Sequence, residues 1–334
     1  MGKQLIKATD KMNALLKRSG SQNRQEAFAA QIQLAVALTT PLEQGVMSGG
    51  NLEGIYEEIF FQPGVATEFP LDFLTPTKVK EHVAYVVPSH GRIPERHVEG
   101  DFVMVPTFEI ASSIDWLLRY ARDARWDIVE RALQVLDGSF TKKKNDDGWH
   151  TLLAAGVDRN IMVNDSAATA GRFTKRLVSL LKTEMRRRAG GNAASLKRGK
   201  LTDLWVSPEA TEDMRDWDAD DVDDVTRREI FVAPDGSFNK IFGVFLHELD
   251  ELGVNQEYQN YFDDILLGTM ASNDVEIVVA LDLLATDSFV NPVREQVRVY
   301  PDETLHRQRR AGYYGWGEHG YSVLDNRRIL LGSF

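Results

Sequence analysis

The residue pattern that comes nearest to known catalytic chemistry is the run from His247 to Glu251, which has the sequence HELDE. It begins like the helix of a zinc protease, in which a second histidine four residues after the first places both imidazoles on one face. Position 251 is a glutamate, so the second ligand is missing. No catalytic zinc site is therefore predicted. A soluble metal-dependent hydrolase that uses His247 and Glu248 remains a less favoured alternative function.

A second pattern, GWGEHG from Gly315 to Gly320, has the glycine spacing of a dinucleotide-binding loop. Such a loop is followed by a helix and a second parallel strand, and only 14 residues follow Gly320. The pattern therefore predicts a turn, and no cofactor is expected.

A run of aspartates resembles the first positions of a calcium-binding loop, namely Asp216, Asp218 and Asp220. Such a loop requires a glycine where Asp221 stands and a bidentate glutamate where Arg227 stands. The sequence therefore predicts a solvated acidic loop and no metal site. The seven histidines are scattered, and each is interpreted as structural.

Composition narrows the class of protein. A chain of 334 residues can bury one or two sizeable cores, and the absence of cysteine excludes disulfides and thiolate metal sites. No apolar run approaches the ~20 residues of a membrane span, so no membrane partner is expected. The net charge of −11 argues against a general nucleic-acid binder, because phosphate affinity depends on Lys and Arg, but it permits a local basic surface.

Charge is segregated along the chain. Ten basic residues stand between Arg172 and Lys200 against one acidic residue, Glu184, and six aspartates stand between Asp216 and Asp224. Runs of this kind are usually solvated faces. In a symmetric assembly they could meet across subunits and set register and orientation.

The longest predicted element is a helix from Glu109 to Asp137, because apolar residues recur there at steps of three and four. Thr107 is expected to cap its start and Gly138 to end it. A polar loop from 138 to 148 would follow.

Residues 1 to 45 predict two short helices, which Ser19 to Ser21 separates and Pro41 ends. Their apolar stripes are too narrow to make a core. The segment is therefore interpreted as an arm that packs on something else.

Residues 78 to 105 predict a long β-hairpin with a basic, proline-containing tip. Val79 to Val87 alternates apolar and polar residues, Pro88 to Gly91 starts a turn, and Asp101 to Val105 returns. A two-stranded ribbon is marginal in water, so we expect support from another chain. The alternative is a hairpin that lies on its own domain.

The remaining predicted elements are shorter. A basic helix begins near Phe173 and ends before Gly190, and Ser207 with Pro208 opens another helix. Strands are predicted at 160–163 and 204–206, in a hairpin that joins 230–232 to 241–246 through Pro234 to Gly236, and in three C-terminal pieces at 295–300, 305–314 and 321–331.

In this order the elements resemble those of the major capsid proteins of tailed bacteriophages, a fold also used by encapsulin shells. LWVSPEA at 204–210 and the closing segment from Ala280 to Phe334 carry the resemblance, which covers nearly the whole chain. It implies an α+β fold with an N-terminal arm at 1–55, a lead-in and extended hairpin loop at 56–106 (the loop from about 75), a peripheral domain at 107–170 and 288–334 with a spine helix at 109–137, and an inserted axial domain at 171–287.

The resemblance also implies a function. The chain would be a structural shell subunit, not an enzyme, without catalytic, cofactor-binding or metal-binding residues. It would form hexamers and pentamers of itself around double-stranded DNA, bound on the inner face without sequence specificity. Portal, scaffolding or decoration proteins would be further partners, and the shell would be a virion capsid assembled in the host cytoplasm.

The candidate assembly contacts are Arg92, Ile93, Pro94, Glu95, Arg96, Arg186, Arg187, Arg188, Asp218, Asp220 and Asp221. The nearest alternative is an encapsulin-like compartment with the same fold that encloses enzyme cargo.

Overall fold

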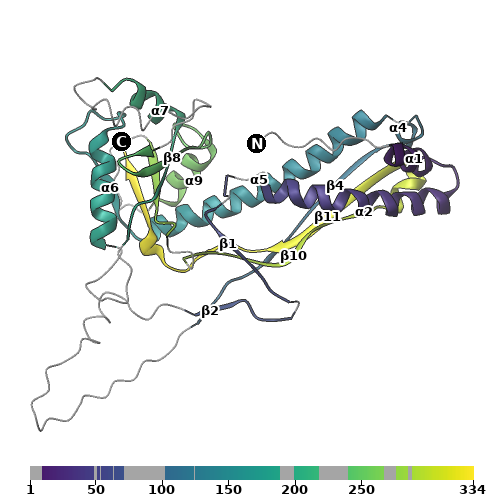
Figure 1. Ribbon diagram of the computed structural model, residues 1–334, viewed down its shortest axis with the longest axis horizontal. Helices are drawn as coiled ribbons and strands as arrows, with labels where there is room; N and C mark the ends of the chain where they lie inside the picture. Colours follow the sequence, from purple (N-terminus) through teal and green to yellow (C-terminus); the bar gives the residue numbers. More distant parts are fainter. Residues whose placement is uncertain are drawn as a thin grey trace, which may run out of the picture. The chain divides into compact units, whose positions relative to one another are not determined.

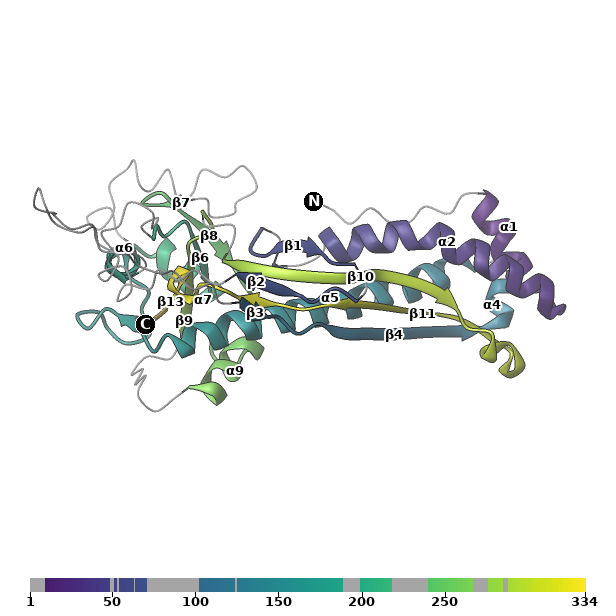
Figure 2. The ribbon, with the colours of Figure 1, turned by 90° about the horizontal axis from the view of Figure 1, so that it is seen from below.

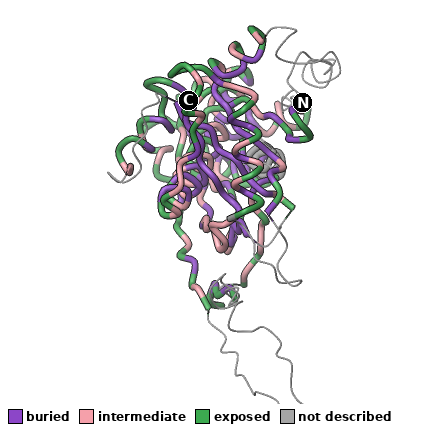
Figure 3. Tube along the Cα trace, turned by 90° about the vertical axis from the view of Figure 1, so that its left-hand side faces the viewer, coloured by how far each residue is buried: buried purple, intermediate pink, exposed green. Residues whose placement is uncertain are grey.

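The computed structural model describes residues 10–48, 51–52, 54–62, 64–70, 102–123, 125–188, 199–217, 240–266, 276–284 and 288–334 (Figure 1). Two compact units are distinguished by their internal contacts. Unit 1 comprises 1–67, 105–148 and 291–321, and unit 2 comprises 68–104, 149–290 and 322–334. Each unit has a hydrophobic core of its own, whose buried residues are purple in Figure 3.

Unit 1 opens with two helices, α1 (Asp10–Ser19) and α2 (Arg24–Ser48). Leu16, Leu34 and Leu38 are fully buried in the core of unit 1, in the same cluster as Trp116 and Ala121. The prediction that this segment packs on something else is confirmed for these helices, because the rest of unit 1 covers their apolar face.

The break between α1 and α2 lies where Ser19 to Ser21 predicted it. The Ser19 hydroxyl donates to the Leu16 carbonyl at 2.7 Å, and Gly20 lies so close to the backbone nitrogen of Arg122 that a Cβ would stand 2.7 Å from it. The predicted stop at Pro41 is wrong, because α2 continues through it to Ser48. A proline removes one backbone hydrogen bond, and the other turns of this 25-residue helix tolerate that loss.

The predicted spine helix from Glu109 to Asp137 is wrong in its first part. Phe108–Leu117 forms strand β4, and Leu118–Arg122 forms the short helix α4. Thr107, the predicted helix cap, therefore precedes a strand. Its hydroxyl donates a hydrogen bond to the Glu318 carboxylate.

The spacing of the apolar residues explains this error. Ile110, Ile114 and Leu118 are four residues apart, which places them on one face of a helix but equally on one face of a strand. A strand forms because β11 (Arg310–His319) pairs antiparallel with all ten residues of β4, from Phe108↔His319 to Leu117↔Arg310. Local pattern cannot contain that information.

A long helix does form, but it is α5 (Trp126–Asp158). Gly138, the predicted stop, lies in its middle with open space where a Cβ would stand, and the predicted polar loop is helical. Lys143 and Asp147 within this stretch form an i,i+4 ion pair at 2.6 Å. Its buried residues in unit 1 recur at steps of three and four: Trp126, Val129, Leu133, Leu136 and Phe140.

The sheet of unit 1 has the order β1–β10–β11–β4, with β1 at Glu57–Phe60 and β10 at Phe289–Pro301 (Figure 2). Strand β12 (Ser322–Val323) pairs with the start of β10. Residues of α1, α2, α4 and α5 form one core cluster with Ile110, Trp116, Val297, Val299, Ala311 and Tyr313 of the sheet.

The predicted turn at Gly315 to Gly320 is wrong, because β11 runs through this segment to His319. Its glycines serve close packing. A Cβ on Gly315 would stand 3.1 Å from the ring of Phe140, and one on Gly317 would stand 3.0 Å from Val297. Before β11, the predicted piece at 305–314 begins with the 3-10 helix η1 (Thr304–Gln308).

Unit 2 contains a six-stranded mixed sheet in the order β5–β13–β9–β6–β8–β7. Its strands are β5 (Met162–Asn164), β13 (Ile329–Ser333), β9 (Ile277–Leu281), β6 (Asp203–Val206), β8 (Val244–Glu248) and β7 (Lys240–Ile241). The helices described in unit 2, besides the end of α5, are α6 (Lys175–Arg188), α7 (Pro208–Arg215) and α9 (Glu257–Ile265).

Several local predictions in unit 2 are confirmed. The basic helix is α6, the strand before Ser207 is β6, and Ser207 caps α7, accepting from the Ala210 backbone N–H at 3.2 Å. The strand predicted at 241–246 is interrupted, because Phe242 and Gly243 both have positive φ and form a tight turn between β7 and β8. The predicted hairpin turn at Pro234 to Gly236 lies outside the described residues.

The C-terminal piece predicted at 321–331 is also interrupted, by the 3-10 helix η2 (Asn326–Arg328) between β12 and β13. The predicted long hairpin is described only at its base. There β3 (Phe102–Met104) confirms the return strand and pairs antiparallel with β2 (Glu68–Pro70). The predicted outgoing strand and the tip lie outside the described residues. None of the helices described is both long and apolar enough to span a membrane.

Candidate assembly surfaces

The candidate contact residues fall in two groups. Arg186 and Arg187 lie on α6 and are exposed, whereas Leu177, Leu181 and Met185 of the same helix are buried in the core of unit 2. Arg188 is the last residue of α6, and its side chain lies outside the described parts of the chain. The others lie outside the described residues: Arg92, Ile93, Pro94, Glu95, Arg96, Asp218, Asp220 and Asp221. Their roles stay predictions.

The outer face of the unit 1 sheet carries a cluster of aromatic side chains that sequence reasoning missed. Tyr300 of β10 stacks on Tyr314 of β11 with ring centroids 5.6 Å apart and on Trp316 at 6.3 Å. Tyr314 keeps 40% of its surface exposed, and its register partner on β4 is the small residue Ser113. Tyr and Trp combine large apolar area with a polar group and are enriched at protein interfaces.

Ion pairs fix the strands around this aromatic cluster. Arg310 of β11 contacts Asp115 of β4 at 2.9 Å, and Arg294 of β10 contacts Glu318 of β11 at 3.3 Å. Glu318 also accepts the hydrogen bond from Thr107. These contacts cross the three long strands and hold one register, so the outer face is a preorganised surface.

The base of the hairpin exposes apolar side chains as well. Phe102 and Met104 of β3 are 62% and 66% exposed, whereas Phe69 of β2 is buried. Two large apolar residues on a two-stranded ribbon are a typical feature of a segment that binds a partner, because burying them removes apolar area from water.

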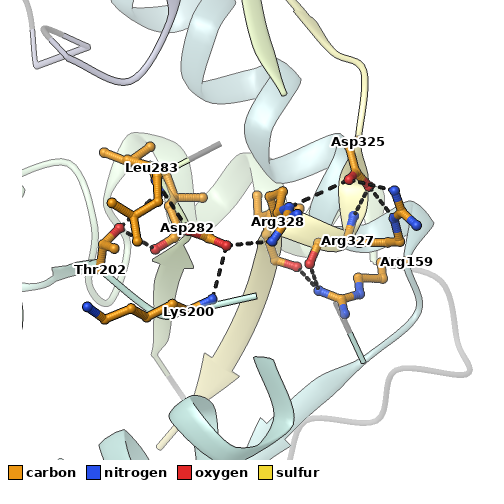
Figure 4. A network of polar contacts seen from close by, with 11 residues as sticks. Arg159, Lys200, Thr202, Asp282, Leu283, Asp325, Arg327 and Arg328 are labelled. Atoms are coloured by element: carbon orange, nitrogen blue, oxygen red, sulfur yellow. Dashed lines mark hydrogen bonds and ion pairs between the residues drawn. The ribbon is translucent and has the colours of Figure 1, made fainter. Parts of the chain in front are cut away.

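Unit 2 is stabilised by a buried ion pair between Asp282, at the end of β9, and Arg328, in η2 (Figure 4). The Arg328 guanidinium donates to the Asp282 carboxylate at 2.7 Å, and both residues are at most 6% exposed. The carboxylate also accepts from the backbone N–H groups of Lys200 at 3.0 Å and Leu284 at 3.2 Å. The pair therefore joins three chain segments at one buried point.

The same network continues to the end of α5 (Figure 4). Arg159 donates to the carbonyl of Arg327 at 3.1 Å and to that of Ile329. Asp325 accepts from the Arg327 side chain at 2.7 and 2.9 Å. These contacts fix η2 and the start of β13, and their pattern is that of structural bracing, with no reactive group held in an open position.

A cluster of titratable side chains surrounds His319 at the end of β11. Burial, with a smaller contribution from nearby Lys144, lowers the pKa of His319 to about 4. Burial also lowers the pKa of Lys144, whose ammonium group is 3.8 Å from the Glu58 carboxylate. Next to them, burial raises the pKa of Tyr56 and of Tyr321, whose rings pack edge to face at 4.8 Å.

The alternative of a metal-dependent hydrolase depended on His247 and Glu248. His247 lies on β8, stacks on Trp205 with centroids 4.5 Å apart, and places Nε2 2.8 Å from Asp203. Glu248 accepts from the Thr211 hydroxyl at 3.0 Å. Neighbours on a strand point to opposite faces, so the two side chains do not converge on one ligand. Over the described parts of the chain, no three His, Asp or Glu residues gather in a metal-binding group.

The sequence matches no protein-family model and no curated protein. The structure is similar to solved structures of phages. A structure from Microbacterium phage Oxtober96 matches with a TM-score of 0.59 at 13% identity, covering 86% of this chain and 91% of that chain. The head structure of Helicobacter pylori bacteriophage KHP40 matches with a TM-score of 0.53 at 10% identity, covering 85% and 90%.

A third match is the acidic stable capsid structure of Helicobacter pylori bacteriophage KHP30, with a TM-score of 0.53 at 9% identity over 83% of this chain and 88% of that chain. At these identities the likeness shows the fold. This chain has the fold of the tailed-phage capsid proteins, as the order of its sequence elements predicted.

Proposed function

We propose that this chain is the structural subunit of an icosahedral viral capsid and assembles into hexamers and pentamers that enclose double-stranded DNA. The observation that carries the proposal is the fold, which the head and capsid structures of two Helicobacter pylori bacteriophages share over 85% and 83% of this chain. Such a subunit acts by packing, and no catalysis is assigned to it.

The construction of unit 1 suits a shell wall. Helix α5 packs Val129, Leu133 and Phe140 into the same core as Val297 and Tyr313 of the sheet. The part of α5 that lies in unit 1 packs closely on strands of ten or more residues and resists bending, because bending would open close-packed contacts. The exposed aromatic side chains of the outer face would then supply apolar area for contacts between copies.

The domain assignment is part of the proposal. The N-terminal arm would span 1–55, the extended hairpin loop about 75–106, the peripheral domain 107–170 with 288–334, and the axial domain 171–287. Because α1 and α2 are covered by their own unit, the described part of the arm would thicken the subunit, whereas the hairpin would reach a neighbour.

Two groups of charged residues would make contacts between subunits. Arg92 and Arg96 at the hairpin tip would bind a neighbouring subunit. Arg186 to Arg188 of one copy would face Asp218, Asp220 and Asp221 of the next, which sets orientation more than affinity. The packaged DNA would meet local basic surfaces on the inner face, because the chain as a whole carries a net charge of −11. Portal, scaffolding or decoration proteins would complete the virion.

Electron microscopy of the purified protein tests the proposal directly. Across a range of salt and crowding conditions we expect rings or closed shells. Protein that stays monomeric throughout would overturn the shell function. Particles that enclose a protein cargo and no DNA would overturn the genome-enclosing part and favour an encapsulin-like compartment.

Two variants test the proposed contacts. Deleting Ser89 to His97 should leave a folded monomer that fails to assemble, and normal shells from this deletion would refute the role of the hairpin tip. Arg187→Glu should weaken assembly, and adding Asp220→Arg should restore it, because the pair then has opposite charges again. Equal assembly of the single and double variants would exclude this contact.

A further inference from the structure

Strand β4 is the edge of the unit 1 sheet, with β11 on one side and no strand of the described residues on the other (Figure 2). It is ten residues long and pairs with β11 without a register shift, whereas the β10–β11 pair contains two. A long, regular edge presents a row of N–H and C=O groups that another strand can bind.

The register identifies the open groups. The Leu118 N–H donates to the Arg309 carbonyl at 2.9 Å, and in an antiparallel pair the inward-bonding residues alternate. The even-numbered residues of β4 therefore bond to β11, and the odd-numbered residues direct their N–H and C=O groups away from it. These residues are Glu109, Ala111, Ser113, Asp115 and Leu117.

Apart from the charges of Glu109 and Asp115, the edge lacks the features by which soluble proteins usually protect such strands. Its sequence, FEIASSIDWL, contains no proline and no lysine, and its pairing contains no bulge. Ala111 and Ser113, two of the residues whose backbone groups are directed away from β11, have small, exposed side chains. A second backbone can therefore approach this edge closely. An unprotected edge of this length is a site where strand addition is expected.

The charge on the strand is polarised from one end to the other. At its start, three glutamates lie side by side across the sheet, namely the exposed Glu109 of β4, Glu318 of β11 and Glu295 of β10. Arg294 is paired with one of them, Glu318. At its finish, Arg310 stands opposite Leu117, with Arg309 and Arg119 exposed nearby, against the single carboxylate of Asp115. Two such strands in antiparallel orientation bring unlike charges together, whereas parallel orientation brings like charges together.

We propose that the free edge of β4 pairs antiparallel with the β4 edge of a second copy of this chain, with Ser113 opposite Ser113 of the partner subunit. This inference rests on the proposed shell function and assigns one of its subunit contacts. The register centred on Ser113 gives all five outward residues a partner, with about ten backbone hydrogen bonds. It places Glu109 beside Leu117 and Arg310 of the other copy, so the acidic end of each edge meets the basic end of its mate.

A single cysteine tests this register, because the native chain has none. In a hydrogen-bonded antiparallel pair opposite Cα atoms are about 5.5 Å apart, within the range of a disulfide. Ser113→Cys should therefore yield a disulfide-linked dimer on mild oxidation, seen on a non-reducing gel. Ala111→Cys is the matched control on the same edge, because the proposed register puts its two copies four residues apart, roughly 14 Å.

The outcomes separate this contact from the proposed function. A dimer from Ser113→Cys and little from Ala111→Cys supports the edge pairing, whether or not shells form. No dimer from Ser113→Cys overturns it, as would happen if another segment of the chain or another protein covered the edge. Equal dimer from both variants also overturns it, because it would reflect collision. Absence of shells together with the specific dimer would count against the capsid proposal alone.

A second variant tests the pairing without oxidation. Ser113→Lys places two ammonium groups opposite each other, so we expect dimer or shell formation to require up to about fivefold more protein at low salt. Ser113→Thr is a conservative control with strong strand propensity, and it should change the protein concentration required for assembly little. Assembly of Ser113→Lys at the native concentration would contradict the proposed register.

Discussion

Removing Arg328 should expose how much unit 2 depends on its buried ion pair. Asp282 is 1% exposed and Arg328 6% exposed, and their contact is 2.7 Å long. Replacing Arg328 by methionine keeps most of the apolar volume but leaves a carboxylate buried without its cation. Breaking one partner of such a pair costs about 3–5 kcal/mol. Two backbone N–H groups still bind Asp282, so we expect the lower end, about 3 kcal/mol.

The matched control is Arg310→Met, which breaks the ion pair with Asp115 at a similar distance, 2.9 Å. Those side chains are 50% and 38% exposed, so its loss should cost at most about 1 kcal/mol. Hydrogen exchange followed on the peptides that contain β9 and β13 measures the local free energy of opening, and urea unfolding measures the cooperative one.

The double variant Arg328→Met/Asp282→Asn tests whether the buried, unpaired carboxylate of Asp282 causes the loss of stability. Removing both charges removes the buried uncompensated carboxylate, so the double variant should be less destabilised than the sum of the two single variants by at least about 1 kcal/mol. If Arg328→Met costs no more than Arg310→Met, or the double variant is merely additive, the buried charge is not what stabilises this corner of unit 2.

Three further predictions follow from single positions. Burial lowers the pKa of His319 from 6.5 to about 4, so on acidification the unfolded chain protonates this side chain before the folded chain does. Between pH 6.5 and pH 4 the free energy of unfolding should therefore fall by about 3 kcal/mol through His319. Urea unfolding at both pH values should show that His319→Phe does not lose this contribution. Ser207→Ala removes the cap of α7 and the donor to Glu276, and should cost about 2 kcal/mol in thermal unfolding against little for exposed Ser179→Ala. Gly138→Ala should raise the free energy of unfolding by about 0.5–1 kcal/mol, because Gly138 lies in the middle of α5 with open space beside it. Gly317→Ala should lower it, because an added Cβ would crowd Val297. Destabilisation by Gly138→Ala would show that α5 does not continue through this position.

Short-range signals in the sequence were reliable where the chemistry is local. Ser207 followed by Pro208 predicts a helix start because the cap and the fixed φ act on the next turn, and α7 begins there. The basic helix and the strand before Ser207 were predicted from the placement of their apolar residues, which is also a local signal. The order of the elements, compared with a known family, predicted the fold class.

Elements whose state depends on distant partners were not predictable in this way. The β4 segment has apolar residues four apart, and only pairing with β11, about 200 residues later, makes it a strand. Gly138 looked like a helix stop because glycine is costly inside a helix, but that cost of about 1 kcal/mol is small beside the burial of Leu136 and Phe140 on either side. GWGEHG was predicted to be a turn because too few residues follow it for a dinucleotide-binding unit. The close contacts of Gly315 and Gly317 with Phe140 and Val297 in the strand are tertiary and could not be predicted locally.

The structure shows open surfaces that the sequence did not suggest. The apolar stripes of α1 and α2 are too narrow to make a core alone, and Leu16, Leu34 and Leu38 are covered within unit 1. Among the described residues these open surfaces include the aromatic cluster on the outer face of the unit 1 sheet and the unpaired edge of β4. Alternation along β4 was the available signal, since every odd-numbered residue from Glu109 to Leu117 is small, charged or exposed. If copies of this chain associate, these surfaces of the sheet are available for contacts between subunits in addition to the proposed contacts of α6 and the hairpin.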